Sequence, residues 1–132
     1  MADDDQPPLI LVDDRQSQPL DVDGLVRLAR ACLIGEGAGN SELSVSLVTE
    51  EEMAGLHERY MDEAGPTDVL SFPLDGRDEL PAGEPRALGD VVLCPEVVGA
   101  RWREPLVHGL LHLLGYDHGE EMAERERAHA AS

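Results

Sequence analysis

The chain lacks the features that would place it in a membrane or outside the cell. It has no apolar run near the roughly 20 residues needed to span a bilayer. Its first residues, Met-Ala-Asp-Asp-Asp, are acidic, whereas a signal peptide begins with basic residues. Its two cysteines, Cys32 and Cys94, lie in apolar surroundings. We therefore expect a cytoplasmic protein without a membrane partner, and cysteines that are buried free thiols rather than a disulfide or metal ligands.

Lysine is absent, and ten arginines stand against 28 acidic residues, which gives a formal net charge of −18. Affinity for nucleic acid normally rests on cationic contacts with phosphates. Most of the acidic residues are expected to form a solvated surface that reflects genome composition or a saline cytoplasm. Such a chain is expected to bind bare RNA weakly. A bound cation, a convergent arginine or a partner that positions the RNA would have to compensate.

The 132 residues are expected to form one domain over residues 8–132, preceded by a disordered tail at 1–7. Apolar residues that alternate or run together predict strands, and recurrence every three or four residues predicts helices. The predicted strands are 9–12, 43–47, 69–74 and 90–94, and the predicted helices are 22–33, 53–60 and 106–114. The last two strands, joined by the loop 75–85, are expected to form a hairpin beside the active-site cleft. Residues 120–131 are predicted to be a polar helix or frayed tail with little to bury, and His129 a bystander within it.

Three histidines form the most informative pattern, His108-Gly-Leu-Leu-His112-Leu-Leu-Gly-Tyr-Asp-His118. Two imidazoles four residues apart lie on one face of a helix, about 6 Å apart along its axis, so both can reach one ion. Gly115 can adopt the left-handed conformation that ends a helix and lets the chain carry His118 back. The surrounding leucines predict a buried helix, and buried imidazoles need partners. The pattern predicts one metal ion, with zinc the first choice, and a fourth position left for water.

The same spacing occurs in the metzincin peptidases, H-E-x-x-H-x-x-G-x-x-H, with one difference. The general-base glutamate of those enzymes follows the first histidine, where this chain has Gly109. A peptidase is therefore disfavoured, and a hydrolase acting on another bond is favoured. We expect a metal-bound water, ionised near neutral pH, to act in place of the missing glutamate. Beyond this water, the sequence does not identify the catalytic group.

Two further motifs make a family resemblance specific. They are Pro66-Thr-Asp-Val-Leu-Ser-Phe-Pro73 and Leu88-Gly-Asp-Val-Val-Leu-Cys94. Together with residues 108–118, and over about 43–120, the chain resembles the bacterial YbeY family of rRNA maturation factors. The resemblance implies an α+β, zincin-like fold with a mixed four-stranded sheet packed against helices and a central metal-binding helix.

The resemblance also implies an activity and partners. It implies a zinc-dependent, single-strand-specific endoribonuclease in 16S rRNA processing and ribosome quality control, with one Zn²⁺ on His108, His112 and His118. The partners would be ribosomal RNA and the small ribosomal subunit, not DNA. Thr67, Asp68 and Ser71 lie where the family borders its substrate groove. Alternatively, Thr67 and Asp68 cap a turn and Ser71 faces solvent.

The chain departs from the family at two places. An arginine usually follows the tyrosine of the second helix, but Tyr60 is followed by Met61. Arg59 is the remaining cation there and the one side-chain candidate for a catalytic role, although it lies about 200° around the helix from that position. The segment 95–103 is also shorter than in the family, which commonly has an additional, partly helical stretch there.

Three functions follow from these observations. The first is a metal-dependent endoribonuclease in rRNA maturation. The second is a ribosome-assembly binding factor with a mainly structural zinc and little nuclease activity, favoured by Met61 and the acidic composition. The third, a metallopeptidase or small-molecule hydrolase, is opposed by Gly109. Among other polar residues, Asp117 could orient a ligand imidazole or cap the turn, Asp90 is expected to make a structural hydrogen bond, and His57 is expected on a helix surface.

Overall fold

The structure, a computed structural model, describes residues 8–61, 67–75, 86–116 and 119–130. Its elements are β1 (Leu9–Asp14), α1 (Val22–Gly35), β2 (Ser41–Leu47), α2 (Glu50–Met61), β3 (Val69–Pro73), β4 (Arg86–Leu93), α3 (Pro95–Val98), a 3₁₀ turn (Gly99–Arg101), α4 (Arg103–Leu113) and α5 (Glu120–Ala130). The predicted tail at 1–7 lies outside the described residues.

The four strands form one mixed sheet in the order β1-β2-β4-β3. β1 and β4 run parallel to β2, while β3 is antiparallel to β4, so the predicted α+β fold and the β3–β4 pairing are confirmed. β4 begins at Arg86, four residues before the predicted start at residue 90, because Arg86 already pairs with Ser41. Gly89, at φ 141°, is a position that only glycine fills easily, since a Cβ there would collide with the Phe72 carbonyl.

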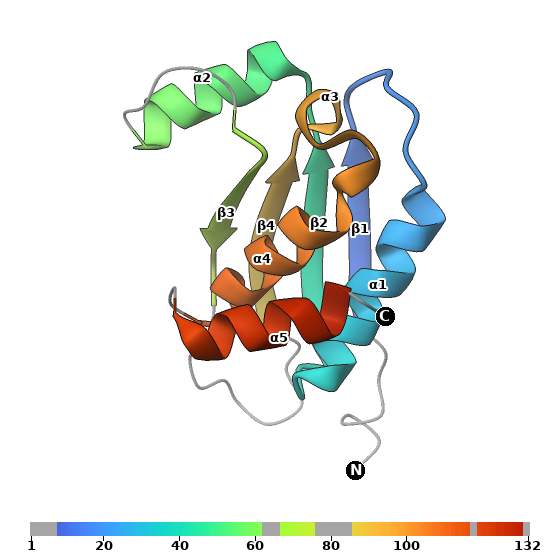
Figure 1. Ribbon diagram of the computed structural model, residues 1–132, viewed down its shortest axis with the longest axis vertical. Coiled ribbons are helices and arrows are strands. Elements are labelled where there is room, and N and C mark those ends of the chain that lie inside the picture. Colours follow the sequence, from blue (N-terminus) through green and yellow to red (C-terminus); the bar gives the residue numbers. More distant parts are fainter. Residues whose placement is uncertain (1–7, 62–66, 76–85, 117–118, 131–132) are drawn as a thin grey trace.

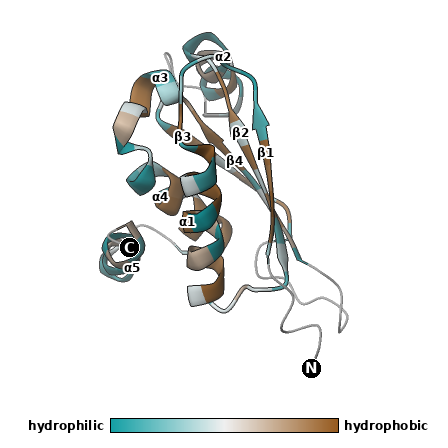
Figure 2. Ribbon diagram, turned by 90° about the vertical axis from the view of Figure 1, so that its right-hand side faces the viewer, coloured by the Kyte–Doolittle hydropathy of each residue, from teal (hydrophilic) through white to brown (hydrophobic). Residues whose placement is uncertain are grey.

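Helices α1, α4 and α5 lie on one side of the sheet (Figures 1 and 2). The inward side chains of the strands meet these helices in one apolar core. Its members with no exposed surface include Leu25, Leu33, Val45, Leu47, Leu106, Leu110 and Leu111. Because α4 is apolar on most of its surface, it occupies the centre of this layer and contacts both β3 and β4.

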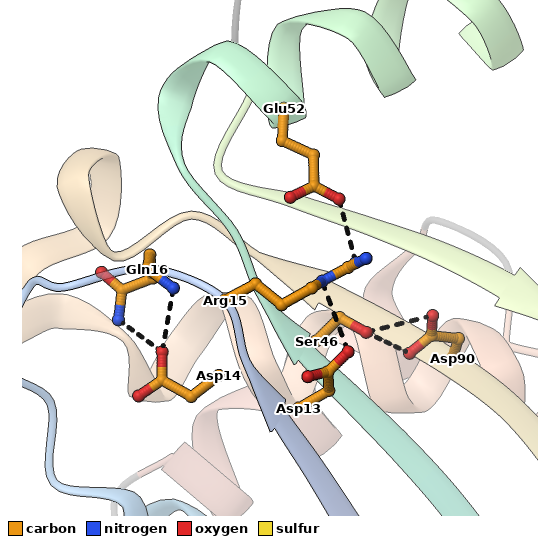
Figure 3. Close-up of polar contacts among 7 residues, drawn as sticks. All are labelled: Asp13, Asp14, Arg15, Gln16, Ser46, Glu52 and Asp90. Carbon is orange, nitrogen blue, oxygen red and sulfur yellow. Dashed lines mark hydrogen bonds and ion pairs between the residues drawn. The ribbon is translucent and has the colours of Figure 1, made fainter.

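The opposite face of the sheet carries a second, smaller cluster under α2. Met53 from α2 packs there with Leu70 of β3 and Val92 of β4, which alternate with the residues that face α4. At the end of β1, Arg15 joins strand to helix, with its Nε 3.3 Å from Asp13 and a terminal nitrogen 3.0 Å from Glu52 (Figure 3). All three side chains are substantially exposed, so these ion pairs contribute about 1 kcal/mol or less each.

Cys32 and Cys94 are both free and buried, as predicted. Burial, together with the nearby carboxylate of Glu36, raises the pKa of Cys32 to about 12, so its thiol stays protonated at neutral pH. No helix among the described residues is both long and apolar enough to cross a membrane.

Candidate functional site

Helix α4 brings two of the three predicted metal ligands together. The Nε2 atoms of His108 and His112 lie 3.2 Å apart, and the two rings meet edge to face with their centroids 4.7 Å apart. The buried residues of α4 fix its rotation, and Gly115 ends the helical segment at φ 96°, as its position predicts. The third predicted ligand, His118, lies outside the described residues, as does Asp117.

The other ring nitrogen of each histidine has an oxygen partner. His112 Nδ1 donates to the Tyr116 carbonyl at 3.1 Å, and His108 Nδ1 donates to Glu126 Oε2 at 3.2 Å. A carbonyl and a carboxylate can only accept, so these partners assign the proton of each neutral ring to Nδ1. Both Nε2 atoms then present lone pairs to the same point.

This arrangement fits a bound cation. Two lone pairs 3.2 Å apart repel each other unless a proton or a metal ion lies between them. Two nitrogens at about 2.05 Å from a tetrahedral zinc ion are about 3.3 Å apart, close to the observed separation. Imidazoles held through their second nitrogen by a carboxylate or carbonyl are typical zinc ligands. Within the described residues no group of three potential ligands occurs, so the described part of the donor set is this pair.

Glu126 reaches the site from α5, which the sequence did not predict. The prediction of a polar helix with little to bury is confirmed over α5, where Met122, 2% exposed and part of the main core, is the one residue described as buried. His129, predicted to be a bystander, is not among the described residues that line the cavity at the histidine pair, although its Nε2 lies 2.7 Å from Glu36 Oε2. These contacts join residues far apart in the chain, and a polar sequence gives no sign of them.

The histidine pair opens into a cavity of about 650 Å³ between β3 and α4. Its described lining includes all three predicted substrate residues, Thr67, Asp68 and Ser71. It also includes three carboxylates, from Asp68, Glu104 and Glu126, and no arginine. With neutral histidines, the described walls are therefore formally negative, and a cation bound at the histidines would oppose that charge.

The three predicted substrate residues, which precede or belong to β3, make different contacts. Asp68 Oδ1 accepts hydrogen bonds from the Val69 amide at 2.8 Å and from the Thr67 hydroxyl at 3.4 Å. Thr67 and Asp68 therefore cap the turn and also line the cavity. Ser71 is half-buried rather than solvent-facing. Its hydroxyl donates to the Gly109 carbonyl at 3.0 Å and fastens β3 to the histidine helix.

Gly109 explains why this helix can lie so close to the sheet. A Cβ at Gly109 would sit 3.0 Å from Val69 Cγ2 and from Val91 Cγ1, and 3.1 Å from Ser71 Oγ. The position where metzincins carry their glutamate therefore faces β3 and β4 and has no room for a long side chain.

Arg59 lies away from this cavity. It is exposed on α2, the helix whose Met53 packs on the opposite face of the sheet, and it is not among the described lining residues. His57 is on the same helix. Asp90 accepts a long hydrogen bond from Ser46 at 3.4 Å, the structural role expected of it (Figure 3). Burial raises the pKa of Asp90, and this bond partly opposes the shift.

Fold and site together define a class of protein: an α+β domain whose buried helix presents a histidine pair to a cavity at a sheet edge. Residues 12–131 match the family model described as Endoribonuclease YbeY. The chain belongs to this family.

Individual relatives agree. An Endoribonuclease YbeY of Acidothermus cellulolyticus is 56% identical, with 65% of this chain and 63% of the relative covered. That of Thermobifida fusca is 48% identical, over 82% of this chain and 79% of the relative. The alignment with the first of these thus spans less than two thirds of that relative's length. The solution structure of TM1509 from Thermotoga maritima has a similar fold, with a TM-score of 0.57 and 26% identity over 92% of this chain and 87% of that one.

Proposed function

We propose that this protein is a zinc-dependent endoribonuclease that cuts single-stranded RNA, with ribosomal RNA of the small subunit as its substrate in the cytoplasm. Family membership supports the RNA hydrolase class. The observation that carries the metal assignment is the pair of Nε2 atoms 3.2 Å apart, each on a ring whose Nδ1 has an oxygen partner.

His108, His112 and His118 would hold the ion in a zincin-like arrangement. Zinc, when bound, supplies a Lewis acid for a phosphoryl oxygen and activates water near neutral pH. The Tyr116 carbonyl and the Glu126 carboxylate keep both described rings in the tautomer whose Nε2 carries a lone pair that can bind a metal ion. Gly109 and Ser71 hold β3 against the helix that carries these rings.

Thr67, Asp68 and Ser71 would form the wall along which the RNA lies. They precede or belong to β3, an edge strand of the sheet, and line the same cavity as His108 and His112. A hydroxyl of Thr67 can donate to a phosphate or ribose oxygen, whereas Asp68 can only accept from a ribose hydroxyl or base. Because the described lining has no arginine, the ribosome would help to position the acidic substrate.

Replacing His112 by alanine tests the proposal. The variant removes one Nε2 ligand, so we expect it to remain folded and to lose both zinc and cleavage of a single-stranded RNA oligonucleotide. His57→Ala is the matched control, because it removes a histidine from α2 on the opposite face of the sheet. Cleavage that survives in His112→Ala, or in wild-type protein stripped of metal, would contradict the nuclease assignment.

A second candidate is a ribosome-assembly factor in which zinc is mainly structural. The carboxylates of Asp68, Glu104 and Glu126 in the cavity favour it, because they repel a phosphate backbone. In that case His112→Ala would unfold the chain, and the wild-type protein would bind small-subunit RNA or its proteins without cutting. The melting temperature and the cleavage rate of one variant thus separate the two candidates.

We also propose that residues 8–132 form one domain. Its main core cluster draws residues from α1, the sheet, α4 and α5, that is, from Leu25 to Met122. A core that draws on elements near both ends of the described chain favours a single cooperative unit.

A further inference from the structure

Glu36, directly after α1, is a buried carboxylate outside the cavity. Its side chain is only 2% exposed, and both of its oxygens have partners from the C-terminal part of the chain. Oε1 accepts from the Tyr116 hydroxyl at 2.7 Å. Oε2 accepts from His129 Nε2 at 2.7 Å and is paired with Arg125 Nε at 3.0 Å.

The contact through Oε1 leads to one metal ligand. Tyr116 lies just beyond α4, and its side chain is held by Glu36 while its own carbonyl accepts the Nδ1 proton of His112. Fixing the phenol therefore fixes the residue whose backbone determines the tautomer and ring orientation of His112.

The contacts through Oε2 lead to the other described ligand. Arg125 and His129 belong to α5, the helix that also carries Glu126, and Glu126 accepts the Nδ1 proton of His108. Met122 is the only residue of α5 classed as buried in the described structure, so apolar packing alone gives this helix little support. The ion pair and hydrogen bond to Glu36 supply a second attachment close to Glu126.

Electrostatics favours a charged Glu36. Burial alone would raise the pKa of this carboxyl, but the hydrogen bonds from His129 and Tyr116 and the charge of Arg125 outweigh it and lower the pKa below its ordinary value. The group is therefore ionised at neutral pH and accepts from all three side chains at once.

We propose that Glu36 is a positioning residue for the metal centre: its two oxygens hold Tyr116 and α5, and through them the rings of His112 and His108. The inference rests on the proposed function, because it concerns the same ion. Glu36 is not among the described residues that line the cavity, and its side-chain contacts go to Tyr116 and α5 rather than to His108 or His112. Its effect would therefore pass through Tyr116 and Glu126.

The test uses two variants of the full chain and one control. Tyr116→Phe removes only the hydroxyl that reaches Glu36 Oε1, and Glu36→Gln removes the charge that holds both attachments. Glu124→Gln is the matched control, since it makes the same exchange at an exposed position of α5. Zinc affinity is measured by competition with a chelator, and the ring tautomers are read from ¹⁵N NMR spectra of the metal-free protein.

We expect Tyr116→Phe to weaken zinc binding about tenfold and to make His112 a mixture of tautomers while His108 keeps its proton on Nδ1. Glu36→Gln should disturb both rings and weaken zinc binding more, and Glu124→Gln should match the wild type.

Wild-type tautomers and zinc affinity in Tyr116→Phe and Glu36→Gln would overturn the proposal, even if both variants were less stable. Should Glu36→Gln fail to fold, Tyr116→Phe decides alone. Should the wild-type protein take up no zinc, the proposed function fails, and the tautomers of the metal-free proteins still decide the role of Glu36.

Discussion

At the scale of single residues, the site depends on where side chains are missing as much as on the histidines. Gly109 lets the backbone of α4 approach Val69 and Val91, and the Ser71 hydroxyl then reaches the Gly109 carbonyl. The motif shows that the metzincin base is missing, but the reason appears only in the structure: the sheet occupies the space where that side chain would go.

Gly109→Ala should therefore destabilise the protein, although alanine is the better helix former. The new methyl group would press on two valines from the sheet and force α4 outward, at a cost of about 1–3 kcal/mol in the free energy of unfolding. Gly55→Ala is the control, because nothing lies within 4 Å of a Cβ there, and we expect it to stabilise α2 by about 0.5–1 kcal/mol. Urea denaturation measures both, and a Gly109→Ala protein at least as stable as wild type would contradict the close packing.

At the scale of elements, the sequence predicts what local periodicity encodes. Strand β2 and helix α1 follow from it, because buried positions recur there every second or every third to fourth residue. The start of β4 at Arg86 could not be predicted, since pairing with Ser41 decides it. The attachment of α5 could not be predicted either, because its contacts are polar and join Glu36 to Arg125 and His129.

The stability that Glu36 provides by attaching α5 should depend on pH. A carboxyl whose pKa is lowered on folding stabilises the fold above its unfolded pKa of about 4.5, and this contribution is lost as the pH falls through the lower, folded value. Glu36→Gln should thus lower the melting temperature clearly at pH 7, and the difference from wild type should shrink as the pH falls below about 4.5. Thermal unfolding between pH 3 and 7 measures it. A difference that does not change with pH would mean that the charge of Glu36 contributes nothing.

At the scale of the whole molecule, the charge of −18 opposes an RNA substrate. The arginines do not compensate at the cavity, since its described lining contains none and Arg15, for example, is paired with Asp13 and Glu52. The composition alone predicts that such an acidic chain binds bare RNA weakly. The structure adds that the carboxylates also lie beside the histidines.

Binding of single-stranded RNA should respond to salt in the opposite way from a basic RNA-binding protein. Proteins that neutralise phosphates lose affinity as salt rises. Here added salt screens repulsion between two acidic partners. We expect the affinity for an RNA oligonucleotide to stay level or to rise between about 50 and 300 mM NaCl, at constant zinc, as measured by fluorescence anisotropy. A steep loss over this range would show that an arginine cluster binds the RNA.

The zinc content of the protein, purified without added metal, tests the account most directly, because the central claim is that His108 and His112 converge on one ion. Mass spectrometry of the wild-type and His112→Ala proteins is expected to find about one zinc ion per wild-type chain and almost none in the variant. A metal-free wild-type protein, or a folded variant that keeps its full zinc, would contradict the account.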